Sequence, residues 1–188
     1  MKIKNETNTF WLCISGIMSA LIFVATYIRI DIPIGPSTAM ISLGNVLCIA
    51  SGLLLSPVLA GLSSGTGSFI FDLVTPQYLF SAPFTFFSKF CMSFICSKFI
   101  EKNSKKNSKK TNFLGALSGI LSFIIIRTIK VFIYNKAVLN LELWANIILA
   151  SKSISVTIIN SVLALIFALP LALSLERSLL KIGLNFSK

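Results

Sequence analysis

The strongest constraint on the fold is a series of six long apolar runs separated by short polar segments. A helix needs about 20 apolar residues to cross the hydrocarbon core of a bilayer. Hydrophobic residues make up 55% of the 188 residues and charged residues only 12%, whereas soluble domains carry about 25% charged residues. We therefore expect a single all-α membrane domain over residues 1–188, with six transmembrane helices at about 10–30, 39–55, 58–74, 80–100, 113–134 and 154–175.

The segments between the runs indicate where the helices end. Residues 31–37 contain two prolines and a glycine, which do not continue a helix. Residues 75–78 are expected to form a short outer loop, and residues 135–151 an amphipathic segment whose Trp144 suits the membrane interface. Residues 101–112 read EKNSKKNSKKTN and form a polar linker of low complexity. The first run is too long for a signal-peptide core and more spans follow, so we interpret it as a retained helix.

The distribution of basic residues predicts the orientation in the membrane. Six crossings put both termini on the same side. Eleven of the 17 Lys and Arg residues would lie on the side of the termini and the 101–112 linker, against four on the other side. Because cytoplasmic segments are enriched in Lys and Arg, we expect both termini and the linker to be cytoplasmic, in a multi-pass protein of the cell membrane.

Several kinds of chemistry are excluded by missing residues. The chain has no histidine, which rules out histidine bases, Ser-His triads and histidine metal sites. Its cysteines lie inside apolar runs without C-x-x-C spacing and are interpreted as small buried hydrophobes: Cys13, Cys48, Cys91 and Cys96. No G-x-x-x-x-G-K-[ST] motif is present, so the chain cannot hydrolyse ATP with that loop. We expect no enzymatic activity, no cofactor and no metal, and we attribute the net charge of +11 to membrane orientation rather than nucleic-acid binding.

Three ionisable residues, Asp72, Lys89 and Arg127, lie within the apolar runs. Such groups are costly in a membrane and suggest function. In the six-helix arrangement all three fall in the outer half, which predicts a polar pocket that opens outward. Two structural alternatives remain: Asp72 and Lys89 could neutralise each other, and Arg127 and Lys130 could extend to the headgroups. Other polar residues expected in the outer half are Asn45, Gln77, Tyr78, Tyr134 and Asn160.

Small residues form a second pattern. The first run contains Ser15, Gly16, Ser19 and Ala20 at small-x-x-x-small spacing, which lets helices approach closely. We interpret these four residues as a docking surface for another subunit, with internal packing as an equal alternative. The glycines of the third run, at positions 61, 65 and 67, are interpreted as internal packing positions.

The segment SLGNVLCIASGLLLSPVLAGLSSGTGSFIFDL, followed by YLFSAPFTFFSKF, resembles the substrate-binding S components of energy-coupling factor (ECF) transporters. That family's pattern has Leu-Gly-Asp, a helix with Gly and Pro, Gly-x-Gly-Ser, an Asp, and then Ala-Pro and a Lys. This chain departs from it at Asn45, where the pattern has an acidic residue. The matching residues are Gly44, Gly52, Pro57, Gly65, Gly67, Ser68, Asp72, Ala82, Pro83 and Lys89.

The resemblance implies a subunit that binds a vitamin under outer loops. It also implies partners: a transmembrane coupling subunit, docked by the first helix, and two ATPase subunits, with toppling of the S component to release the vitamin inside. Candidate ligands are hydroxymethylpyrimidine, a pyridoxine-type ring or a riboflavin-type ring. The expected substrate-binding residues are Asn45, Asp72, Tyr78, Lys89, Arg127 and Asn160. The alternative is a stand-alone secondary transporter or channel, which would need charges across the whole membrane or an inverted repeat.

Overall fold

The computed structural model describes residues 2–34, 37–103, 109–137 and 143–181. Within them lie six α-helices. Five of these are long and apolar enough to cross a membrane, and the sixth is apolar but shorter. The predicted all-α membrane bundle is therefore confirmed. The elements in chain order are α1 (Lys2–Tyr27), β1 (Arg29–Ile34), β2 (Ser37–Ser42), α2 (Gly44–Leu54), α3 (Pro57–Val74), the 3-10 helix η1 (Pro76–Ser81), α4 (Ala82–Lys102), α5 (Lys109–Ala137) and α6 (Leu143–Lys181).

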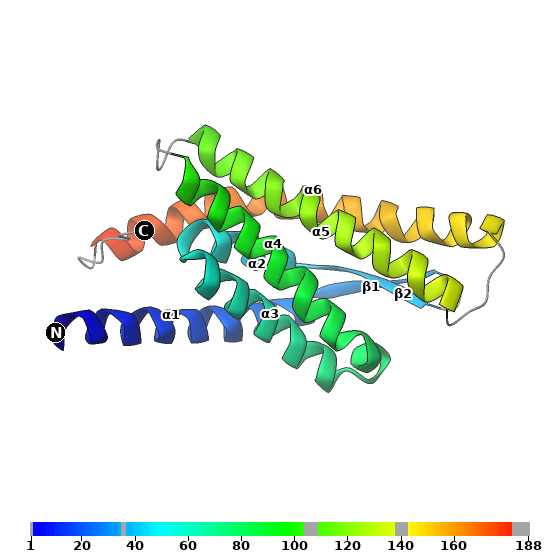
Figure 1. Ribbon diagram of the computed structural model, residues 1–188, viewed down its shortest axis with the longest axis horizontal. Helices are drawn as coiled ribbons and strands as arrows, with labels where there is room; N and C mark the ends of the chain where they lie inside the picture. The colour runs from blue at the N-terminus through cyan, green and yellow to red at the C-terminus, as the bar shows by residue number, and fades with distance from the viewer. Residues whose placement is uncertain (1, 35–36, 104–108, 138–142, 182–188) are drawn as a thin grey trace.

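The helices alternate in direction, so both ends of the chain lie together (Figure 1). One end of the bundle, the linker end, holds the start of α1, the end of α4, the start of α5 and the end of α6. The other end, the hairpin end, holds the end of β1, the start of β2, η1 and the start of α6. The short helix α2 lies in the middle, packed against α1, α3, α4, α5 and α6.

The β-hairpin is the main difference from the expected helices. We expected helices over 10–30 and 39–55, but α1 ends at Tyr27 and α2 begins only at Gly44. Between them β1 and β2 pair antiparallel, with Arg29 opposite Ser42 and Ile34 opposite Ser37. The physical reason is the alternation of Ile30, Ile32 and Ile34 with other residues, which is the period of a strand. Hydropathy averaged over a long window does not detect this alternation.

Other helix bounds also extend beyond the apolar runs. We expected the last helix over 154–175, but α6 spans Leu143–Lys181 and contains Pro170. The expected linker 101–112 is shortened at both ends by α4 and α5, and the expected loop 75–78 lies largely within η1. Hydropathy marks only the part of a helix that suits lipid, whereas backbone hydrogen bonding continues into the polar flanks.

Three glycines allow α3 to approach its neighbours closely, because they carry no Cβ. A Cβ on Gly61 or Gly65 would lie within 3.0 Å of the rings of Phe90 and Phe86 on α4. On the other side of α3, a Cβ on Gly67 would meet the backbone of α1. The internal-packing interpretation of these three glycines is therefore confirmed.

A buried serine cluster joins the centre of the bundle. The Oγ of Ser93 on α4 lies 2.7 Å from the carbonyl of Cys48 on α2 and 2.6 Å from the Oγ of Ser64 on α3. Ser51 on α2 completes the cluster, with its Oγ 2.8 Å from that of Ser64. Because no water is present in a bilayer core, these hydroxyls satisfy one another and tie α2, α3 and α4 together.

Candidate functional site

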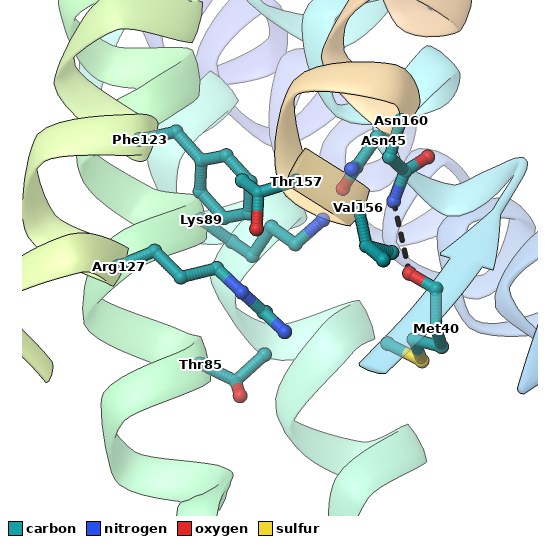
Figure 2. Close-up of a pocket in the computed structure, with 9 residues that line it drawn as sticks. All are labelled: Met40, Asn45, Thr85, Lys89, Phe123, Arg127, Val156, Thr157 and Asn160. Atoms are coloured by element: carbon teal, nitrogen blue, oxygen red, sulfur yellow. Dashed lines mark hydrogen bonds between the residues drawn. The ribbon is translucent and has the colours of Figure 1, made fainter. Parts of the chain in front are cut away.

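A small cavity lies under the hairpin, between β2, α2, α4, α5 and α6 (Figure 2). We call it the hairpin cavity. The free space is about the size of one water molecule, so a larger ligand requires the hairpin or side chains to move. The lining residues are Met40, Asn45, Thr85, Lys89, Phe123, Arg127, Val156, Thr157 and Asn160.

Two cations and an aromatic ring dominate one wall of the cavity. Lys89 is only 4% exposed, and its Nζ lies 5.0 Å from the centre of the Phe123 ring. The Arg127 guanidinium carbon lies 6.0 Å from the same ring. Figure 2 shows both cationic groups extending toward the same space. The ring face stabilises each cation by about 0.5–2 kcal/mol, which compensates only part of the cost of removing a charge from water.

Asp72 lies close to these cations but does not line the cavity. Its carboxylate is 1% exposed, and its Oδ1 has no hydrogen-bond partner among the described residues. It lies beside the Thr85 hydroxyl and interacts electrostatically with Lys89, Arg127 and Lys130. In the described part of the chain no carboxylate comes within 4.0 Å of Lys89. A direct Asp72–Lys89 ion pair, one of the alternatives left by the sequence, is therefore not formed in this structure.

The two asparagines of the cavity differ in what they contact. Asn160 on α6 holds the hairpin: its Nδ2 donates to the carbonyl of Met40 at 3.3 Å, and its Oδ1 accepts from the N–H of Ser42 at 3.4 Å. Asn45 on α2 is 1% exposed, and its Oδ1 has no hydrogen-bond partner among the described residues. A buried acceptor without a donor is costly, so Asn45 is the better candidate for contact with a ligand.

Tyr78 also contacts the hairpin rather than the cavity. Its hydroxyl donates to Asp31 Oδ1 at 3.0 Å, while Arg29 Nε lies 3.2 Å from Asp31 Oδ2. The Arg29 guanidinium carbon lies 5.4 Å from the Tyr78 ring and 4.8 Å from the Phe71 ring. We call Arg29, Asp31 and Tyr78 the latch. It joins the hairpin to η1, opposite the contact that Asn160 makes from α6.

The structure brings into the cavity five residues that the sequence reasoning missed. Helical spacing could have found most of them. Phe123 is one turn before Arg127, Thr85 is one turn before Lys89, and Thr157 is three residues before Asn160, so each pair shares a helix face. Met40 and Val156 depend on where the hairpin lies, which spacing does not predict. Two other polar residues expected in the outer half, Gln77 and Tyr134, are exposed and do not line the cavity.

The small residues of α1 divide between two faces. Ser15 donates to the Leu59 carbonyl at 3.2 Å, and Ser19 Oγ lies 2.8 Å from Thr66 Oγ1, so both serines face α3. Gly16 and Ala20 are exposed, and a Cβ on Gly16 would meet nothing within 4 Å. Of these four small residues, only Gly16 and Ala20 lie on an exposed face of α1 where another protein could contact them.

Six apolar helices and a small polar cavity covered by a hairpin define a multi-pass membrane protein. The comparisons with known proteins identify its kind. The family model described as "ECF-type riboflavin transporter, S component" matches residues 6–177, which include the hairpin and nearly all of the six helices. The chain belongs to this family of S components, which are transport subunits rather than enzymes. Neither the curated proteins nor the solved structures contain a match.

Proposed function

We propose that this S component binds a vitamin with a flat, oxygen-bearing ring of riboflavin type in the hairpin cavity. The observation that carries the proposal is the convergence of Lys89, Arg127 and Asn45 on one cavity beside Phe123. The match to a riboflavin-transporter family favours a riboflavin-type ring over hydroxymethylpyrimidine or a pyridoxine-type ring. Membership of that family does not favour a stand-alone secondary transporter.

The polar groups of the cavity suit such a ring. Lys89 and Arg127 supply hydrogen-bond donors, and the unpartnered Oδ1 of Asn45 requires a donor. The ring edge of riboflavin presents an N–H between two carbonyl oxygens, which offers one donor and two acceptors. Ligand sites bury most of the ligand and use a few such polar groups for specificity. We assign Asn45, Lys89 and Arg127 to ligand contact, and Asp72, Tyr78 and Asn160 to supporting positions.

Entry of the vitamin requires the hairpin to open. Sites for drug-sized ligands occupy about 300–1,000 Å³, far more than the space now under the hairpin. The hairpin is held by the latch on one side and by Asn160 and an apolar contact of Ile32 and Ile41 with Val156 on the other. These contacts are few compared with those between the helices, so the hairpin is the part that can move at least cost.

We further propose that the linker end faces the cytoplasm and that the subunit works with a coupling subunit and two ATPases. The excess of basic residues toward the linker end supports this orientation. The lack of a phosphate-binding loop supports the need for separate ATPases. The exposed face of α1 around Gly16 and Ala20 would receive the coupling subunit, because small residues permit close helix contact.

The proposal is tested by equilibrium binding to the purified chain in lipid nanodiscs. Riboflavin, hydroxymethylpyrimidine and pyridoxine are titrated separately, and small molecules that co-purify are identified by mass spectrometry. We expect riboflavin or a close analogue to bind more tightly than the other two. A protein that is consistently empty and binds none of the three would contradict the proposal.

A further inference from the structure

A second cavity lies at the linker end of the bundle, between the end of α2, the start of α5 and the last turns of α6. We call it the linker-end cavity. Its volume is about 140 Å³, much larger than that of the hairpin cavity. Apolar cavities of about this size stay free of water and accept apolar groups such as a benzene ring. The wall is mostly apolar, with Leu53 and Leu54 from α2 and with Leu169, Ala172 and Leu173 from α6.

The polar residues of this cavity lie on the side nearest the linker end. Glu176 lines it one turn beyond Ala172 on α6, and Asn112 lines it from the first turn of α5. Two exposed cations are close to them in the chain, Arg177 beside Glu176 and Lys110 two residues before Asn112. Charged residues at the ends of membrane helices lie at the depth of the lipid headgroups. The cavity therefore has a charged mouth at headgroup depth and an apolar interior.

Two features of the helices account for this space. Pro170 lies inside α6, where the helix begins to line the cavity. A proline in a helix donates no hydrogen bond and its ring crowds the preceding turn, so it bends or loosens the helix. On α5, a Cβ on Gly115 would meet Ile100 of α4, and one on Gly119 would meet the α4 backbone. The start of α5 is therefore held close to the end of α4 (Figure 1), and space remains between α5, α6 and α2.

We infer that the linker-end cavity holds an acyl chain of a phospholipid whose headgroup carries a primary ammonium, with the ammonium on the Glu176 carboxylate. A lipid has the same order along the bilayer normal as the cavity, with charged groups outside and hydrocarbon inside. Arg177 and Lys110 provide positive charge for the headgroup phosphate. Phosphatidylethanolamine has this chemistry. The inference goes beyond the proposed function and does not depend on which vitamin is bound.

The choice of headgroup follows from Glu176. A carboxylate repels a headgroup that carries only negative charge, such as phosphatidylglycerol. A primary ammonium instead donates charge-assisted hydrogen bonds to it, which are about twice as strong as neutral ones. The trimethylammonium of phosphatidylcholine has the same charge but no N–H to donate. These three lipids, with the same acyl chains, therefore separate the effect of charge from that of hydrogen bonding.

The test is native mass spectrometry of the full chain in detergent, titrated with each of the three lipids. We expect phosphatidylethanolamine to bind about fivefold or more tightly than either phosphatidylcholine or phosphatidylglycerol. It should also raise the thermal unfolding temperature more than the other two, because a ligand that binds only the folded protein stabilises it.

Two variants assign the binding to this cavity. Glu176→Gln should reduce the preference for phosphatidylethanolamine over phosphatidylcholine to less than about twofold. Glu101→Gln is its matched control, because Glu101 is exposed at the same end of the bundle and does not line the cavity. Leu173→Trp should fill the interior and weaken the binding of both lipids. Ile166→Trp, at an exposed position of α6, is the control for that enlargement.

The outcomes are distinct from those that test the proposed function, since none of them measures vitamin binding. Equal affinity for the three lipids, tightest binding of phosphatidylglycerol, or a preference that Glu176→Gln retains would overturn the inference. Thermal unfolding in detergent shows whether Leu173→Trp is folded. If it is folded and binds phosphatidylethanolamine as tightly as the wild-type protein, the inference is also overturned. If it is not folded, the comparison of Glu176→Gln with Glu101→Gln decides.

Discussion

Asp31 and Tyr78, 47 positions apart in the chain, meet at 3.0 Å between the tyrosine hydroxyl and the carboxylate. The contact joins strand β1 to η1, and Arg29 holds the other carboxylate oxygen at 3.2 Å. Asp31 is about one-third exposed and Arg29 less so. The latch is therefore partly reached by water and can open without the cost of separating a fully buried ion pair.

The latch should control how fast a ligand leaves. Asp31→Asn weakens the pairing with Arg29, and Tyr78→Phe removes the hydroxyl but keeps the ring beside Arg29. A hydrogen bond of this kind is worth about 1 kcal/mol, so we expect dissociation to become roughly fivefold faster in each variant. The measurement is the dissociation rate of bound vitamin by stopped-flow fluorescence. Tyr134→Phe, at an exposed tyrosine on α5, is the control. Equal dissociation rates in the wild-type protein and all three variants would mean that the latch does not control the release of the ligand.

Loss of either cavity cation should weaken binding while the fold is kept. Lys89→Ala and Arg127→Ala each remove a charged donor, and we expect affinity to fall about tenfold or more. Lys98→Ala, on the exposed side of α4, should bind normally. Thermal unfolding of each variant checks that the protein is folded. Unchanged affinity in both cavity variants would mean that Lys89 and Arg127 have a structural role and do not bind the ligand.

Larger side chains on the exposed face of α1 should impair uptake without impairing vitamin binding. Gly16→Leu and Ala20→Leu alter only the exposed face, so we expect normal vitamin binding and impaired uptake in cells with a complete transporter. Small residues at a helix interface permit a close approach that leucine prevents. Ser155→Leu, on an exposed position of α6, is the control for a small-to-large change in lipid. Normal uptake in both α1 variants would exclude docking through this face.

Stability should separate Gly67 from Gly16. A Cβ on Gly67 would press on the carbonyl of Ser19 and lie 3.1 Å from Ile22 Cβ, whereas one on Gly16 meets nothing. We expect Gly67→Ala to destabilise the protein by about 1–3 kcal/mol, and Gly16→Ala to be neutral or slightly stabilising because alanine favours helix. Thermal unfolding in the same detergent compares the two. An equal shift in both variants would mean that α1 and α3 are not in close contact.

Cysteine labelling tests the orientation. In a variant whose four native cysteines are replaced by alanine, Gln77→Cys places a thiol at the hairpin end and Lys102→Cys places one at the linker end; both positions are exposed. A maleimide that does not cross membranes should label Gln77→Cys in intact cells and Lys102→Cys only after lysis. The reverse labelling pattern would mean that the linker end faces the outside of the cell, opposite to the proposed orientation.

The sequence alone predicted the class of fold, because partition into lipid depends mainly on how many consecutive apolar residues a segment contains. The same reasoning located Lys89 and Arg127 as costly charges, and the strings around Gly44 and Asp72 indicated the family. It did not predict the hairpin, since an alternation over six residues is averaged out in a window of helix length.

Which residues meet was decided only by the tertiary structure. In a membrane protein the side chains that face lipid and those that face other helices are both apolar, so hydropathy does not show how a helix is rotated. The sequence therefore did not show that Ser15 and Ser19 contact α3 whereas Gly16 and Ala20 are exposed. Packing also separated Asp72 from Lys89. The apolar helices were thus predictable from the sequence, whereas the meeting of Asn45, Lys89 and Arg127 at one cavity was decided by packing.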